Sequence, residues 1–117
     1  MSEVLQLPVI LSQHTDGHHA TFTLEVPADL PYFQGHFPGF AILPGVVQLG
    51  WAEHLGRRLF PLPPRFLALE ALKFQDLILP GYRLTLTLLF KSEKGKLEFS
   101  FASDAGKHSS GRLVFAE

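Results

Sequence analysis

The sequence predicts an α+β domain in which a curved antiparallel sheet wraps around one central helix. Six segments have the alternation or apolar content of strands, whereas only residues 44–59 have the length and apolar content of a helix. Two short Gly-containing turns late in the chain are typical of hairpins between successive strands. With 117 residues, the chain is long enough for one domain with a sizeable core, residues 1–117, and leaves little room for a second.

The first two strand segments, residues 4–11 and 20–26, flank a turn at residues 14–18. In the second segment, apolar residues at positions 22, 24 and 26 alternate with polar ones, which predicts one buried and one solvated face. Histidines at positions 14, 18 and 19 surround the Asp-Gly centre of the turn. Because the sequence offers no second group of ligands, they indicate an exposed hairpin tip, and no metal site is expected.

Residues 44–59 are the one strong helix candidate. Pro44 suits a helix start, where its missing N–H does no harm, and Arg57 and Arg58 suit the negative end of the helix dipole. The first three turns are almost wholly apolar, so we expect the helix to be mostly enclosed. The proline-rich residues 60–64 end it.

Four strand segments follow the helix, and turns at residues 93–96 and 104–107 join the last three. These segments are residues 66–74, 82–91, 97–103 and 110–115. An apolar helix followed by such an antiparallel meander predicts a sheet that wraps around the helix. Because so small a sheet covers only one side of the helix, we also expect two chains to associate.

Composition excludes several classes of function. The formal net charge of −1 argues against nucleic acid as the main partner. The absence of cysteine excludes disulfides and thiolate chemistry. No basic region followed by a long apolar run opens the chain, and no apolar run approaches the roughly 18 residues of a membrane span. A soluble cytoplasmic protein is therefore expected.

Residues 35–39, Gly-His-Phe-Pro-Gly, cannot form a regular helix or a central strand. Pro38 has no N–H donor and fixes its own φ, and it keeps Phe37 away from helical torsion angles. His36 therefore lies in an irregular loop just before the apolar helix. Either a catalytic histidine or a structural histidine that satisfies loop carbonyls would explain this placement.

This motif, followed by Leu-Pro-Gly-Val at residues 43–46, resembles the signature of hot-dog-fold β-hydroxyacyl-acyl-carrier-protein dehydratases. Gln48-Leu49 followed by Trp51 is most similar to the branch found in aryl-polyene and related pigment clusters. Stretches at residues 72–75, 80–81 and 110–115 fit that branch as well, so the resemblance spans most of the chain. It implies a hot-dog fold and the elimination of water from a 3-hydroxyacyl thioester in fatty-acid or polyene biosynthesis.

The resemblance also implies roles for residues around the helix start. His36 matches the base that takes a proton from C2, a role that imidazole can fill near neutral pH. The backbone N–H groups of Gly45 and Val46 match the donors that stabilise the enolate-like thioester oxygen. The residues that would line the acyl-binding site are Phe33, Phe37, Pro38, Gly39, Leu43 and Trp51.

The chain departs from the family at the position of the acid. Family members carry Asp or Glu fourteen residues after the histidine, where this chain has Gly50. Glycine cannot donate a proton, and inside a helix it costs on the order of 1 kcal/mol relative to alanine. Glu53 or His54, one turn further on, could replace the acid, and Glu53 could instead be a surface or interface carboxylate.

The same resemblance implies the partners. The substrate would arrive on the phosphopantetheine arm of an acyl carrier protein, with no further cofactor. Arg57, Arg58, Lys73 and Arg83 could dock the acidic carrier or the phosphate of its arm, or could be scattered solvated charges. The chain would form a homodimer, a heterodimer with another hot-dog dehydratase, or a higher oligomer. Two alternative functions stay open: a catalytically silent subunit that binds acyl chains or pairs with an active dehydratase, and an acyl thioesterase on the same fold.

Overall fold

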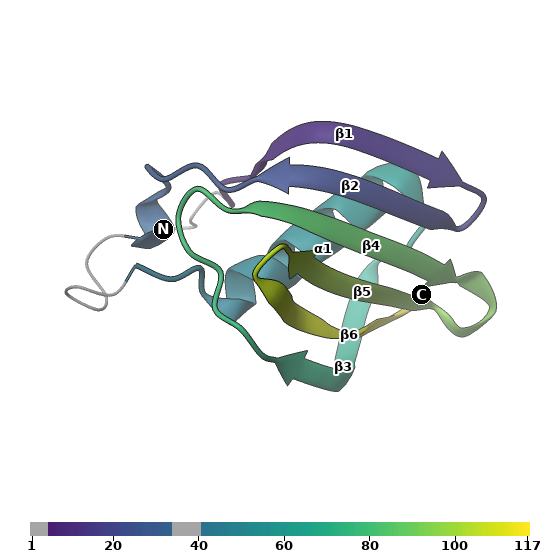
Figure 1. Cartoon of the computed structure of the whole chain (residues 1–117). Helices are drawn as coiled ribbons and strands as arrows, with labels where there is room; N and C mark the ends of the chain where they lie inside the picture. Colours follow the sequence, from purple (N-terminus) through teal and green to yellow (C-terminus); the bar gives the residue numbers. More distant parts are fainter. Residues whose placement is uncertain (1–4, 34–40) are drawn as a thin grey trace.

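The computed structural model describes residues 5–33 and 41–117, and within them one α-helix lies against one face of a six-stranded sheet (Figure 1). The elements are β1 (Val9–Asp16), β2 (His19–Glu25), the 3-10 turn η1 (Pro31–Phe33), α1 (Gly45–Leu59), β3 (Arg65–Phe74), β4 (Arg83–Lys91), the 3-10 turn η2 (Ser92–Lys94), β5 (Lys96–Ser103) and β6 (Gly106–Ala116). The strands lie in the order β1-β2-β4-β5-β6-β3, and every neighbouring pair is antiparallel. Consequently β1 and β3 are the two edges of the sheet.

The core lies between α1 and the face of the sheet that it covers. Along β4, Leu84, Leu86, Leu88 and Phe90 are buried, while the residues between them are more exposed. The same alternation runs along β2 and β5, as expected for strands with one solvated face. Trp51, from the middle of the helix, is fully buried against this apolar face. The predicted α+β arrangement of one helix and a meander is therefore confirmed.

The first strand lies later in the chain than the sequence predicts. The expected strand at residues 4–11 is wrong, because β1 runs from Val9 to Asp16 and pairs with β2 up to Asp16 opposite His19. The turn between them is correspondingly tighter and contains only Gly17, with φ of +60°, and His18. β1 is an edge strand with an almost fully exposed pattern, so no alternation marks it. The apolar residues that suggested the earlier strand, Leu5 and Leu7, pack against the core instead.

The other elements agree closely with prediction, apart from the start of β6. The bounds of β2, β3, β4 and β5 each differ by one residue from the expected ones. β6 begins at Gly106 rather than at residue 110, because its polar first residues pair with Ser103, Ala102 and Phe101 of β5. Their polarity hid them from a hydrophobic pattern.

Helix α1 begins and ends where its flanking residues predict. Pro44, with φ of −61° and ψ of 146°, is the residue before the first helical turn. At the other end, Phe60 is extended and its N–H donates to the Gly56 carbonyl. One side of the helix is enclosed, but the side chain of Val46 is 75% exposed, so the expectation of a mostly enclosed helix holds for one face only. Among the described residues, no helix is long and apolar enough to cross a membrane.

Candidate functional site at the start of the central helix

The start of α1 is held by backbone hydrogen bonds that leave two N–H donors without an acceptor among the described residues. The Leu43 N–H donates to the Ile78 carbonyl (2.9 Å), which fixes the approach to the helix. The Pro44 carbonyl accepts from the N–H groups of Val47 and Gln48, the third and fourth residues of the helix. Within residues 5–33 and 41–117, the N–H groups of Gly45 and Val46 donate to no acceptor. These two donors lie at the positive end of the helix dipole, which suits them to a developing negative charge.

The ring of Phe74 lies directly against Gly45. A Cβ atom added at Gly45 would lie 2.5 Å from Cζ of Phe74, so only glycine accommodates the ring in this position. Phe74 is the last residue of β3 and is half exposed. The helix start at Gly45 is therefore next to an apolar ring.

Gln48 is a buried polar residue near the same helix start that sequence reasoning did not assign to the site. Its side chain is 4% exposed, and Nε2 donates to the Leu43 carbonyl at 3.3 Å. Its Oε1 is buried and has no hydrogen-bond partner within the part of the chain that the structure describes. In the sequence, the sign that could have pointed to Gln48 is a single amide side chain within an otherwise apolar helical turn.

The N-terminal residues Leu5, Gln6 and Leu7, here called the N-terminal strap, lie across the middle of α1. The Gln6 carbonyl accepts from Trp51 Nε1 (2.7 Å), and the Gln6 N–H donates to the Tyr32 hydroxyl (2.7 Å). A Cβ atom added at Gly50 would lie 3.3 Å from Cδ1 of Leu5. The side chain of Leu5 therefore lies against Gly50, where a carboxylate side chain would otherwise extend.

Of the remaining residues predicted for the site, some lie near the helix and others fall outside the described residues. His36, Phe37, Pro38 and Gly39 lie outside the described residues. The other three predicted lining residues are Phe33, which is half-buried in η1, Leu43, which is buried at the helix start, and Trp51, which is fully buried. His54, on the helix, is exposed.

Glu53 and the predicted docking residues lie on the surface at separate places. Glu53 forms an ion pair with Arg57 (3.0 Å), one turn along the helix. Arg57 also donates to the carbonyls of Pro63 and Pro64, just before β3, whereas Lys73 lies near the end of β3. Because a strand extends by about 3.3 Å per residue, Arg57 and Lys73 lie near opposite ends of β3 and do not belong to one continuous patch.

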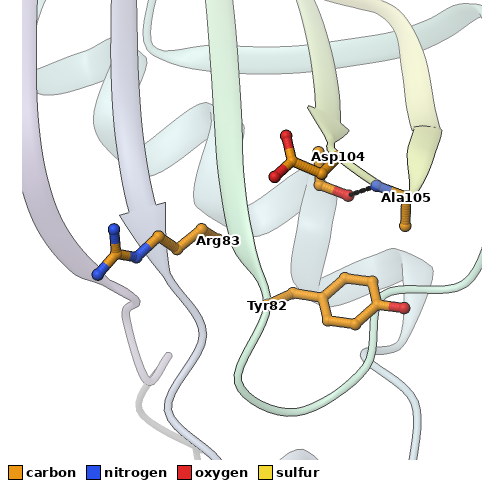
Figure 2. A pocket seen from close by; sticks show the side chains of 5 residues that line it. Tyr82, Arg83, Asp104 and Ala105 are labelled. Carbon is orange, nitrogen blue, oxygen red and sulfur yellow. Dashed lines mark hydrogen bonds between the residues drawn. The ribbon is translucent and has the colours of Figure 1, made fainter.

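A second cluster of polar residues lies at the turn between β5 and β6, beside a pocket lined by Tyr82, Arg83, Ser103, Asp104 and Ala105 (Figure 2). His108 is buried, with Nδ1 2.9 Å from the Asp76 carbonyl and Nε2 2.6 Å from the Ser103 hydroxyl. A carbonyl only accepts, so Nδ1 donates to it and Nε2 accepts from Ser103. The Ser103 hydroxyl in turn accepts from the Ala105 N–H, the contact drawn in Figure 2. All these hydrogen bonds are internal, so they fix the hairpin on the segment after β3.

No metal centre accompanies these groups in the part of the chain that the structure describes: no three His, Cys, Asp or Glu side chains come together there. Near the helix start, the described residues bring together two backbone donors, the buried Gln48 and the strap over Gly50.

Comparison with known protein families gives one clear result. A family model described as "ApeI-like: ApeI dehydratase" matches residues 12–112. Among curated proteins, the 3-hydroxyacyl-[acyl-carrier-protein] dehydratase FabZ of Streptococcus pneumoniae is 29% identical over 101 residues, which cover 74% of this chain and 69% of that protein. The FabZ of Clostridium perfringens is 31% identical over 96 residues, with the same coverage.

Solved structures agree with the sequence matches. The dehydratase heterocomplex ApeI:P from Xenorhabdus doucetiae superposes with a TM-score of 0.87 at 30% identity, over 94% of this chain and 98% of that one. An uncharacterized protein from Erwinia carotovora superposes with a TM-score of 0.82 at 36% identity, over 93% of this chain and 95% of that one. The hot-dog fold that the sequence resemblance implies is thereby confirmed.

Proposed function

The chain belongs to the ApeI-like dehydratase family, and from that membership we propose that it takes part in the elimination of water from a 3-hydroxyacyl thioester carried on acyl carrier protein. The FabZ relatives carry this substrate in their names. The observation that carries the proposal is the start of α1, where two backbone N–H groups have no acceptor among the described residues and Gly45 lies against an apolar ring.

In the proposed elimination, His36 and the two backbone N–H groups have separate roles. His36 removes the proton from C2 of the acyl chain, and the electron pair moves onto the thioester oxygen. The N–H groups of Gly45 and Val46 donate to that oxygen while it carries negative charge. The enolate then re-forms the carbonyl as the C3–O bond breaks, and the hydroxyl leaves as water after accepting a proton. The thioester needs close access to the helix start, which glycine at position 45 allows.

Among the described residues, this chain has no evident general acid to protonate the leaving hydroxyl. In our proposal Gly50 stands at the acid position of the family, and the side chain of Leu5 occupies the neighbouring space. Glu53 is engaged by Arg57 at the surface, which argues against it as a replacement. Loss of a general acid typically lowers the rate by about 10² to 10⁴.

We therefore propose that this chain works beside a second hot-dog subunit that contributes the acid. The similar ApeI:P assembly is a heterocomplex of dehydratases, which supports pairing as a mode of action in this family. No cofactor beyond the phosphopantetheine arm of the carrier is needed for this chemistry. The second candidate, a silent subunit that binds acyl chains, is favoured by one observation, the position of Leu5 over Gly50.

A gain-of-function experiment tests the vacant acid position. The double variant Leu5→Ala/Gly50→Asp provides a carboxylate and the space for it. We expect the purified double variant to dehydrate a 3-hydroxyacyl carrier substrate at least tenfold faster than the wild type, because the general acid is restored. Adding His36→Ala should abolish this activity while leaving the melting temperature nearly unchanged.

The matched control is Leu5→Ala/Gly50→Ala, which opens the same space without an acid and should stay as slow as the wild type. Strong activity of the wild-type chain alone that Gly50→Asp abolishes would contradict the vacant-acid proposal. Hydrolysis of the thioester in place of dehydration would indicate a thioesterase instead.

A further inference from the structure

A β-bulge in β6 turns the side chain of His108 toward the interior. Ser109 pairs with Phe101 of β5 and Lys107 pairs with Ala102, so His108 lies between them as an extra residue without an opposite partner on β5. Lys107 is exposed, whereas His108 is only 1% exposed. Bulges re-aim side chains and are frequent next to active sites. The chemistry proposed above gives this buried imidazole no role.

Both ring nitrogens of His108 have hydrogen-bond partners from other parts of the chain. Nδ1 donates to the backbone carbonyl of Asp76 (2.9 Å), and Nε2 accepts from the Ser103 hydroxyl (2.6 Å). The Ser103 oxygen accepts from the Ala105 N–H (3.1 Å), which leaves its own proton directed to the imidazole. These partners hold the ring proton on Nδ1, in the tautomer that can donate to the Asp76 carbonyl.

The Asp76 carbonyl marks the point where the chain leaves the sheet after β3. Gln75 and Asp76 still donate their N–H groups to the carbonyls of His108 and Lys107 in β6 (2.9 and 3.0 Å). Beyond Asp76 the chain crosses the ends of β6 and β5 to reach β4 (Figure 1). The side chain of His108 thus supplies the donor for a carbonyl that a neighbouring strand no longer pairs.

Residues on both sides of Asp76 contact the start of α1. Phe74, two residues earlier, places its ring against Gly45. Ile78, two residues later, is fully buried, and its carbonyl accepts from the Leu43 N–H (2.9 Å). The two neighbours of Ile78 are exposed leucines, so they add little packing to this part of the segment. The placement of the helix start therefore depends on where Asp76 is held.

From these contacts we propose that His108 is a positioning residue for the backbone N–H groups of Gly45 and Val46. Its ring holds Asp76, and Asp76 in turn sets the positions of the two residues that contact the helix start. The role of the N–H groups as donors to a thioester oxygen rests on the proposed function. Donors stabilise such an oxygen only within hydrogen-bond distance, so a small displacement of the helix start lowers the rate without removing a catalytic group.

Two substitutions at His108 separate its two hydrogen bonds. The shorter asparagine keeps a donor at the position of Nδ1 for the Asp76 carbonyl, whereas glutamine keeps an amide at the position of Nε2 beside Ser103. The first test compares hydrogen exchange at two amides, that of Leu43, which donates to Ile78, and that of Leu88 in the middle of β4. We expect His108→Gln to accelerate exchange at Leu43 at least about tenfold and His108→Asn to stay within about threefold of the wild type, with little change at Leu88.

Ser103→Ala is the milder variant, because it keeps the ring and removes only the donor that fixes its tautomer. It should accelerate exchange at Leu43 several-fold, and it decides the question if His108→Gln does not fold. The matched control is Ser100→Ala, at a serine of the same strand whose side chain makes no hydrogen bond within the described chain, and it should change neither amide. Unchanged exchange at Leu43, equal acceleration at Leu43 and Leu88, or equal effects of the two His108 variants would overturn the positioning role.

Kinetics in the Leu5→Ala/Gly50→Asp background supply a second readout. There His108→Gln should lower kcat about tenfold or more and leave KM within about twofold, because the displaced donors act on the transition state. His108→Asn should retain most of the activity. A raised KM with kcat unchanged would contradict a role in placing the thioester donors. Absence of dehydration in all these proteins, the parent included, would contradict the proposed function, whereas exchange at Leu43 would still decide whether His108 positions the helix start.

Discussion

Gly50 and Gly56, both inside α1, differ in the atoms that an added methyl side chain would contact. At Gly56, an added Cβ would lie 2.5 Å from Cδ2 of Leu97, a fully buried residue of β5. At Gly50, the nearest atom is Cδ1 of Leu5 at 3.3 Å, in the strap over the helix. Gly56 is thus required by close packing of the helix on the sheet. At Gly50 the contact is less severe, because the end of the Leu5 side chain would have to move by only a few tenths of an ångström.

This difference predicts that replacing glycine by alanine has opposite effects on the free energy of unfolding at the two positions. Gly56→Ala should lower the free energy of unfolding by about 1–3 kcal/mol, because the core around Leu97 is overpacked. Gly50→Ala should raise it by up to about 1 kcal/mol, because alanine has the higher helix propensity and Leu5 needs to shift only slightly. Chemical denaturation of both variants and the wild type measures these changes. Destabilisation by Gly50→Ala as large as that by Gly56→Ala would show that the strap is packed rigidly.

At the scale of elements, Arg57 joins the end of α1 to two other parts of the fold. Its guanidinium donates to Glu53 and to the carbonyls of Pro63 and Pro64, and it lies 4.9 Å from the centre of the Phe115 ring of β6. It therefore links the helix end, the segment before β3 and the last strand. The neighbouring Arg58 is exposed and makes no ion pair within the described residues.

Alanine substitutions at these adjacent arginines should distinguish a contribution to folding stability from a contribution to carrier-protein docking. Arg57→Ala should lower the free energy of unfolding by about 1–2 kcal/mol, because a cation–π contact, an ion pair and hydrogen bonds are lost together. Arg58→Ala should change it by less than about 0.5 kcal/mol. Weaker binding of an acyl carrier protein by Arg58→Ala without loss of stability would support docking at Arg58. Equal stability of the two variants would rule out the linking role of Arg57.

The elements also show what sequence reasoning could and could not find. The helix and β2, β4 and β5 were predicted to within one residue because each buries one face, which leaves a periodic pattern in the sequence. β1 was misplaced because it is an exposed edge, and the start of β6 was missed because it is polar. At the site, the motif predicts the roles of Gly45 and Val46, and these roles stay predictions. Two further features depend on tertiary packing: Oε1 of Gln48, which has no partner among the described residues, and the position of Leu5 over Gly50. The role of His36 also stays a prediction.

For the whole molecule, the two edges of the sheet differ in their apolar exposure. Large apolar side chains on β3 that are more than one-third exposed are Phe66, Leu67, Leu69, Leu72 and Phe74. On β1 the corresponding residues are only Val9 and Leu11. Within the described chain β3 pairs with β6 alone, so its other side presents unpaired backbone groups beside exposed apolar surface. Such an edge is prone to association, and we infer that subunits meet along β3.

Matched charge variants at the two edges test this inference. The pair Leu67→Lys/Leu69→Lys places two cations on β3, and the pair Val9→Lys/Leu11→Lys places two on β1, at side chains of similar exposure. Light scattering coupled to size exclusion at micromolar concentration should show an oligomer for the wild type and for the β1 pair. The β3 pair should be monomeric, because lysines along a shared edge repel and resist burial. A monomeric wild type, or dissociation by the β1 pair instead, would show that the exposed β3 edge is not where subunits meet, and the acid proposed to come from a second subunit would then have to approach from another face.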